Sequence, residues 1–519
     1  DYSRGEMEIE SQKAMFDGTM KAGAWRSCMS YAPGEATESS EAATGEALGI
    51  KGLAWAIFEW ARNPYYNVIV IYVFAIYFAE EVAGGGAAGQ TVIANTIAAA
   101  GMIMAILAPI LGVIVDKGGR KKLFIFVVLA TLGICSFALG FIYPETPGAV
   151  PLGMTLLATA YCCYTVSELL HNALLPAAGA QKALPMISGL GLAFGNIAGV
   201  VMLLGLLAAP SIFPWVAAQP YGIGPLSGPV VAVWLCLFIV PFFLFMPDSL
   251  GSTGSWRKSF VTTFTPPNFK LWTGVPGLNY LWSAPINASL FLAEKFRESP
   301  NVMKFLLARM IYADGLAVLL TMGGVYVAGV LDWSINQVII YGVFGSLIGA
   351  LGGIVGGWLD GLMGPKRALI LELTAILILL IIQLSITQEA LFFGLIPSGQ
   401  EVWDGFGTGL FTTLSDVVYF SLIVPVAISI VACISSSRYM LVHISPPEKI
   451  GEFFGFYAMA ASVTVWIGPL LVSIMTAAFD DQRIGFSAVG LLFLAGVFGI
   501  AFLVRADKTP EHLKPSPSY

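Results

Sequence analysis

The chain has 519 residues, of which 57% are apolar and 11% are charged, and its formal net charge is -6. A soluble domain carries about 25% charged residues, so the composition excludes an ordinary water-soluble protein. We expect no nucleic-acid partner, and for a membrane chain the positions of the charges inform more than the net charge. The six cysteines show neither a disulfide framework nor metal-ligand spacing, so we expect no metal site and no cofactor.

Apolar runs occupy most of the chain. Residues 1–48 form a polar tail that cannot bury enough apolar surface to fold alone. A spanning helix needs roughly 20 mostly apolar residues, and six such runs follow at about 53–78, 91–115, 123–143, 152–176, 185–209 and 228–246. A linker over residues 247–302 mixes basic and aromatic residues, as interfacial segments do. Six more runs precede a tail over residues 506–519, at about 303–329, 336–358, 367–388, 411–437, 452–478 and 484–505.

These runs predict an all-α polytopic membrane protein with twelve transmembrane helices. We expect two six-helix bundles, over residues 49–246 and 303–505. The joints after even-numbered helices hold most of the joint Lys and Arg residues, whereas the joints after odd-numbered helices hold one basic residue, Arg483. The positive-inside rule therefore places the even joints and both termini in the cytoplasm.

Two sequence echoes indicate that the halves are duplicates. The joint after the second helix reads GVIVDKGGRKK and the joint after the eighth reads GGWLDGLMGPKR, with Asp116 and Asp360 separated by 244 positions. Arg62 and Arg309 each lie in an Ala-Arg-x-x-Tyr string and are 247 positions apart. Two matches at nearly one offset predict a pseudo-two-fold relation between helices 1–6 and 7–12.

The joint after the second helix resembles the loop motif of the major facilitator superfamily between helices 2 and 3. In such a motif the glycine lets two helices approach, and the Asp and the basic cluster can form a charge-paired latch that breaks when the halves rock. The second copy has one extra residue between Asp360 and Gly364, which alters the latch geometry. The simplest alternative is a positive-inside anchor at each joint. The residues assigned to the latch are Gly112, Asp116, Lys117, Gly119, Arg120, Lys121, Gly356, Asp360, Gly364, Lys366 and Arg367.

Four longer strings resemble the vacuole-effluxer-like branch of that superfamily. They are FEWARNPYYNVIV from Phe58, NALLPAAGAQKALPMISGLGLAFGNIAG from Asn172, FLLARMIYADGLAVL from Phe305 and SRYMLVHISPPEKIGEFFGFYAMA from Ser437. The resemblance implies a solute carrier. Bacterial members of the branch are largely of unassigned substrate, and the eukaryotic namesake exports amino acids from the vacuole, so the resemblance does not fix the solute.

Ionisable side chains within spans are costly and usually face a cavity or a partner. Polar side chains share one helical face on the first helix (Glu59, Arg62, Asn63 and Tyr66) and another on the fourth (Tyr161, Tyr164, Glu168, His171 and Asn172). Arg62 and Glu168 both lie roughly 14 Å from the cytoplasmic boundary, and we predict that they are in contact. Three interpretations stay open: a static ion pair, a substrate carboxylate held by Arg62, and proton coupling through Glu168 or Glu59.

The seventh helix carries a second polar group, formed by Arg309, Tyr312 and Asp314. Arg309 and Asp314 are five positions apart and therefore poorly placed to bond each other within one helix. We expect each to have a partner on another helix. Asp314 is a further candidate for proton coupling, and the alternative is a fixed hydrogen bond between helices.

Together these features predict a secondary active transporter in a bacterial inner membrane. It would move a small organic solute, such as an amino acid or similar metabolite, by alternating access, with lipid around it and protons as a candidate coupling ion. The alternative is a transport-inactive scaffold or accessory subunit of a larger membrane complex, and the charges retained in the spans favour the carrier. The sequence has no Walker motif, HExxH string or nucleophile elbow, so we expect no enzyme activity.

Overall fold

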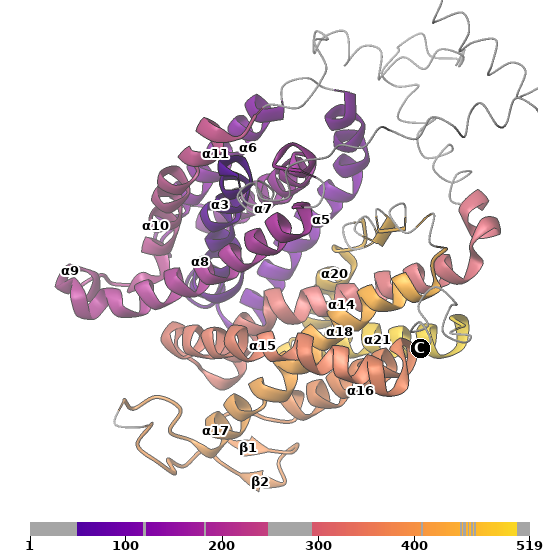
Figure 1. Ribbon diagram of the computed structural model, residues 1–519. Coiled ribbons are helices and arrows are strands. Elements are labelled where there is room, and N and C mark those ends of the chain that lie inside the picture. Colours follow the sequence, from indigo (N-terminus) through magenta and orange to yellow (C-terminus); the bar gives the residue numbers. More distant parts are fainter. Residues whose placement is uncertain are drawn as a thin grey trace, which may run out of the picture. The chain divides into compact units, whose positions relative to one another are not determined.

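The structure is a computed structural model, drawn in Figure 1. It describes residues 49–117, 121–180, 183–247, 293–405, 408–446, 449 and, with gaps at 450–452, 455, 458–459 and 461–462, residues 453–505. Side chains are described except at residues 108–120 and 185. The expected tails at residues 1–48 and 506–519, and most of the expected linker at residues 247–302, lie outside the described residues.

The described residues are mainly long apolar helices. Eleven of these helices are long and apolar enough to cross a membrane. A twelfth, α20 (Ile467–Phe479), is shorter, and helical residues from Phe453 onward precede it before a turn at Thr464. The prediction of an all-α polytopic membrane protein is therefore confirmed.

The first half contains six spans. Its first span is built from α3 (Ile50–Pro64), η1 (Tyr65–Tyr72), α4 (Phe74–Tyr77) and η2 (Phe78–Val82). The next five are α5 (Gly86–Lys117), α6 (Lys121–Leu139), α7 (Ala149–Asn172), α8 (Leu184–Ile212), and α10 (Ile223–Phe238) with α11 (Val240–Phe245). Short helices η3 (Leu175–Ala177) and α9 (Pro214–Ala217) lie in the joints.

The second half repeats this plan. Its spans are α14 (Pro300–Leu331), α15 (Ile335–Met363), α16 (Pro365–Leu384), α17 (Leu414–Ser421) with α18 (Ile423–Ile444), α20, and α21 (Gln482–Phe498) with η6 (Gly499–Leu503). Strands β1 (Ala390–Leu391) and β2 (Ile396–Pro397) form an antiparallel hairpin between α16 and α17, which the hydropathy pattern did not predict.

The same helix pairs are in contact in both halves. In the first half α7 packs on α5 and α6, and α6 packs on α10. In the second half α18 packs on α15 and α16, and α16 packs on α21, which are the equivalent pairs. In Figure 1 the labels α14, α15, α16, α18 and α21 mark this second bundle. The halves are therefore two six-helix bundles with equivalent internal packing.

One lysine in each half joins equivalent helix ends. Lys122, at the start of α6, donates to the carbonyls of Phe243 and Met246 at 2.8 and 2.7 Å, where the sixth span ends. Lys366, 244 positions later at the start of α16, donates to the carbonyl of Ala501 at 2.9 Å, where the twelfth span ends. This shared contact is independent structural support for the repeat.

Glycines allow α15 to cross α18 closely. A Cβ atom at Gly352 would lie 2.6 Å from the carbonyl oxygen of Ile428, and one at Gly356 would lie 2.9 Å from the Cα of Ala432. A side chain at either position would push the helices apart. The role expected for Gly356, close helix approach, agrees with this geometry.

The two halves are hydrogen-bonded at one end of the spans, where α5 begins and α20 ends. The Gln90 amide donates to the Thr476 hydroxyl at 2.8 Å and to the Gln482 carbonyl at 3.0 Å. One turn further along α5, the side-chain Oδ1 of Asn95 accepts from the Ser473 hydroxyl at 2.7 Å. We call this the Gln90 end; Glu168 lies toward the opposite end of the spans.

The first span is not a continuous α-helix. After Pro64 the chain winds as a π-helix from Tyr65 to Tyr72, and a second π segment follows at Phe78–Val82. π-helical turns are rare in proteins, and many of those that occur lie at functional sites. They change which residues of the span share a face.

Candidate substrate site

A cavity of about 960 Å³ lies between the two bundles. This volume is at the upper end of the range of small-molecule sites. Its described lining comes from ten spans, including the first, fourth and fifth of the first half and the seventh, eighth and tenth of the second. A cavity at the interface of two repeats is where transporters bind their solutes.

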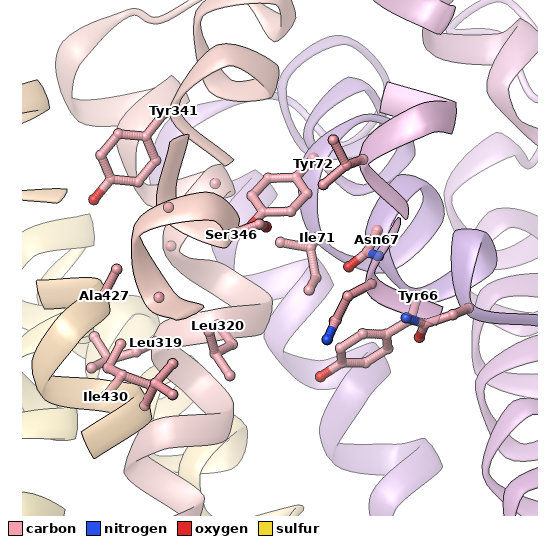
Figure 2. Close-up of a pocket in the computed structure, with 18 of the residues that line it drawn as sticks. Tyr66, Asn67, Ile71, Tyr72, Leu319, Leu320, Tyr341, Ser346, Ala427 and Ile430 are labelled. Atoms are coloured by element: carbon pink, nitrogen blue, oxygen red, sulfur yellow. The ribbon is translucent and has the colours of Figure 1, made fainter. Parts of the chain in front are cut away.

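The walls of the cavity differ in polarity. The first half contributes most of the polar groups: Asn63, Tyr66, Asn67, Tyr161, Tyr164, Thr165, Glu168 and Asn196. The second half contributes mainly apolar groups, among them Leu319, Leu320, Leu347, Val426, Ala427, Ile430 and Val431. Figure 2 shows Tyr66 and Asn67 on one side of the cavity and Leu319, Ala427 and Ile430 on the other.

The π-helical part of the first span forms one edge of the polar wall. Its lining residues are Tyr66, Asn67, Ile71 and Tyr72. Tyr66 and Ile71 are five positions apart, as are Asn67 and Tyr72, and this spacing fits the i to i+5 bonding of a π-helix.

Arg62 lies behind this wall, between two carboxylates. Its Nη2 contacts both oxygens of Glu59 at 3.0 and 2.8 Å, and its Nη1 lies 3.5 Å from Oε2 of Glu168. The predicted contact between Arg62 and Glu168 is present. Glu59, one helical turn before Arg62, is the closer partner.

Arg62, Glu59 and Glu168 differ in how far their side chains are exposed. The side chains of Arg62 and Glu59 are 3% and 16% exposed, whereas that of Glu168 is 50% exposed. Among the described residues that line the cavity, Glu168 alone is an Asp, Glu, Lys, Arg or His. The arginine is therefore enclosed, and Glu168 presents the charge to the cavity.

His171 fixes the buried side of this network. Its ring lies between Trp55 and Phe58, with ring centres 4.0 Å away on each side. Its Nε2 lies 2.9 Å from the Trp55 carbonyl, and the Trp55 indole donates to the His171 carbonyl at 3.0 Å. Because a carbonyl only accepts, Nε2 must carry a proton. Nδ1 lies 3.1 Å from Oε1 of Glu59.

Tyr164 connects the network to the cavity. The Arg62 guanidinium lies 4.2 Å from the Tyr164 ring centre and donates to its backbone carbonyl at 3.3 Å. The Tyr164 hydroxyl donates to the Asn63 side chain at 3.1 Å, and the Tyr66 ring stacks on that of Tyr164. These contacts bring together seven of the nine polar residues predicted on the first and fourth spans; of the other two, Tyr161 lines the cavity and Asn172 is exposed.

The three candidates on the seventh span have other surroundings. Arg309 donates to the Tyr457 carbonyl at 2.7 Å and lies 3.3 Å from its ring centre. Asp314 accepts from the Thr464 hydroxyl at 3.1 Å. Both partners belong to the eleventh span, so the expectation of partners on another helix is confirmed. Tyr312 shares a 2.7 Å hydrogen bond with Ser437 on α18; all three lie inside the second bundle rather than among the described lining residues.

Only part of the expected latch can be described. Gly119 and Arg120, and the side chains of Asp116 and Lys117, lie outside the described residues, and for Gly112 the backbone alone is described. Lys121 is partly exposed and Arg367 is exposed.

In the second copy, Gly364 ends α15 with a φ of 80°, which favours glycine. Asp360 is buried, and one of its oxygens has no hydrogen-bond partner. Lys366 bonds to the end of the twelfth span instead of to Asp360. The latch function of both copies stays a prediction.

Sequence reasoning missed several lining residues. They are Asn67, Tyr72, Asn196, Tyr341, Ser346, Gln383 and Tyr419. Each is a polar or tyrosine side chain within an apolar span, which is the signal that identified the other candidates. Their positions relative to the cavity depend on the π-helix and on helix rotation, which that signal does not give.

Comparisons with known proteins identify the family of this chain and related folds. The family model described as "Vacuole effluxer Atg22 like" matches residues 81–513. The chain belongs to that family. A relative of this vacuole effluxer-like protein is the uncharacterized MFS-type transporter YxiO of Bacillus subtilis (strain 168), 24% identical over 472 residues, which covers 88% of this chain and 95% of the relative.

Solved structures show the same fold. A variant of the nucleoside transporter NupG has a TM-score of 0.57 at 12% identity, over 88% of this chain and 100% of its own. A D-xylose-proton symporter has a TM-score of 0.57 at 12% identity, over 88% of this chain and 98% of its own. The predicted family is confirmed, and the vacuole effluxer-like protein is an MFS-type integral membrane transporter whose relatives and structural neighbours are transporters, not enzymes.

Proposed function

We propose that this protein is a secondary carrier that moves a small organic solute through the central cavity by alternating access. One observation carries the proposal: the cavity lies between two equivalent bundles that are hydrogen-bonded to each other at the Gln90 end. Rocking of the bundles would open that end and close the other.

The charges in the joints between spans support one orientation of the protein in the membrane. Basic residues gather in the joints at the end opposite Gln90, for example Lys121 and Lys122 or Lys366 and Arg367. By the positive-inside rule, that end faces the cytoplasm of a bacterial inner membrane, with both termini on the same side. In this orientation the conformation with a bonded Gln90 end is closed to the outside.

The cavity network supports a division of roles. Glu59 and Arg62 form a buried pair that we assign to positioning, and Glu168 is the group that meets the solute. Protons are candidates for coupling through Glu168 or Asp314. An amino acid or similar metabolite is one class of solute to screen.

A reversible cross-link at the bonded end tests alternating access. Asn95→Cys with Ser473→Cys replaces a pair whose side-chain oxygens are 2.7 Å apart. After reconstitution and a solute-uptake screen with and without a pH gradient, we expect oxidation to lower uptake at least tenfold and dithiothreitol to restore it.

Each single-cysteine variant serves as a control for oxidation of the native thiols. Unchanged uptake by the cross-linked protein would refute alternating access through this cavity. Absence of uptake for every solute tested with the unmodified protein would favour the scaffold alternative.

A further inference from the structure

The charge that the described residues present to the cavity is negative. Glu59 and Arg62 contact each other directly and neutralise each other. His171 is fully buried beside Glu59 and is not among the described lining residues. Glu168, whose side chain is half exposed, then leaves one negative charge facing the cavity. A site of this kind favours a cation.

The same geometry disfavours a carboxylate ligand. An anion would have to reach Arg62, whose side chain is 3% exposed, is bonded to Glu59 and lies over the Tyr164 ring. It would also have to pass Glu168, which would repel it. The earlier interpretation in which Arg62 holds a substrate carboxylate is therefore the least compatible with these contacts.

The surroundings of Glu168 suit an amine. Tyr66 and Tyr161 line the same wall, and tyrosine faces attract ammonium groups. The side-chain oxygens of Asn67 and Asn196 are acceptors for N–H donors. A strongly hydrated ammonium ion would find both charge and hydrogen-bond partners here.

The opposite wall suits an apolar body. Leu319, Leu320 and Ile430 face the polar wall across the cavity (Figure 2). The Leu320 side chain is 38% exposed, so a ligand that covers it gains apolar contact. A solute that satisfies both walls has a cationic head and an apolar or aromatic remainder.

We propose that the cavity binds an amphipathic organic cation, with its amine against Glu168 and its apolar body against Leu319, Leu320 and Ile430. This inference rests on the proposed carrier function and specifies its solute class. The geometry assigns recognition to the first half and apolar contact to the second.

Three probes that share a phenyl ring separate charge from shape: 2-phenylethylamine, 2-phenylethanol and phenylacetate. Binding to the purified full chain in detergent would be measured at neutral pH by isothermal titration. We expect the amine to bind at least tenfold more tightly than the alcohol, and phenylacetate to bind most weakly.

Substitutions test which residues produce the preference. Glu168→Gln should reduce the advantage of the amine over the alcohol to less than threefold, because it keeps the shape and removes the charge. Glu389→Gln, at an exposed position near the hairpin, should leave it unchanged. Leu320→Gln should weaken amine and alcohol together, because it acts on the apolar body.

Several outcomes would overturn the inference. These are tighter binding of phenylacetate, an amine preference that survives Glu168→Gln, and no binding of the amine at millimolar concentration. The carrier function would stand in each case if the uptake screen finds a solute whose transport the cross-link blocks. Failure of that screen and of the cross-link would instead remove the proposed function.

Discussion

Arg62 and Arg309 occupy equivalent positions in the two halves, yet their surroundings differ. Arg62 is held between the carboxylates of Glu59 and Glu168 at the edge of the cavity. Arg309 is held by the ring and carbonyl of Tyr457 inside the second bundle. The repeat therefore preserves the position of the arginine and changes its partners.

The two walls differ in the same sense. The first half presents amides, tyrosines and a carboxylate to the cavity, while the second half presents mainly aliphatic side chains. Polar groups of the second half, such as Tyr312 and Asp314, bond between helices of that half. The comparison teaches that the duplicated bundles share packing but divide the chemistry of the cavity.

The largest expected effect separates the two arginines. Arg62→Met leaves two carboxylates without their cation, and breaking a buried ion pair in this way costs about 3 kcal/mol. Arg309→Met removes one charged hydrogen bond and a ring contact, and should cost about half as much. The free energy of unfolding in mixed detergent micelles measures both.

The double variant Arg62→Met with Glu59→Gln sharpens this comparison. Removal of the uncompensated charge should recover at least about 1 kcal/mol relative to Arg62→Met alone. Equal costs for the two arginine variants, or no recovery in the double variant, would contradict the difference in partners.

The next effect concerns the close crossing in the second half. Gly352→Ala places a methyl group 2.6 Å from the Ile428 carbonyl oxygen and should cost about 2 kcal/mol. Gly353→Ala is the matched control, because nothing lies within 4 Å of its added carbon. Equal unfolding free energies for the two variants would show that α15 and α18 are not tightly packed.

A smaller effect tests what the halves share. Lys122→Met and Lys366→Met each remove hydrogen bonds from the lysine to carbonyls at the end of the last span of the same half. We expect each variant to lose about 1 kcal/mol of unfolding free energy, measured in mixed detergent micelles. The loss should be larger for Lys122→Met, because Lys122 bonds to two carbonyls. A loss of stability in only one of the two variants would contradict the equivalence of the two lysine contacts.

The smallest effect is a dependence on pH where the second half begins. Lys449 and Lys295 lie 2.9 and 3.0 Å from Glu298 and hold the pKa of this carboxyl below its usual value. A lowered pKa means that the pairs stabilise the fold at neutral pH and lose this contribution as the pH falls below about 4.

Comparison with Glu298→Gln checks this sign. The thermal midpoint of the unsubstituted protein should exceed that of the variant slightly at pH 7, and the difference should vanish in acid. A difference that grows on acidification would contradict the assignment of the ion pairs.

Hydropathy predicted most of the fold because each span must be apolar over the thickness of a bilayer. The ends of the spans were predicted less accurately. The tenth span was expected at 411–437 and is described at Leu414–Ile444. The eleventh was expected without a break at 452–478 and has a turn at Thr464, whose side chain bonds to Asp314. Such interruptions depend on contacts between helices, which composition does not encode.

The site was predictable in part for a similar reason. Charge and depth correctly indicated that Arg62 meets Glu168. They did not indicate that Glu59 is the closer partner or that the arginine is enclosed, because side-chain direction depends on how Tyr164 and His171 pack around it. The functional roles of these residues stay predictions.

The π-helical turn in the first span affects how that span can change in evolution. A π turn holds one residue more than the α-helical turn it replaces. The extra residue is therefore taken up within the turn, so a return to α-helical winding after deletion of Ile69 would leave the residues beyond it facing as they do now. Ile71 and Tyr72 would stay on the wall that they share with Tyr66, and the span would lose only the residue that the wider turn adds. A solute site can thus gain or lose one residue at this turn without rotation of the rest of the span, a change that a substitution matrix does not score.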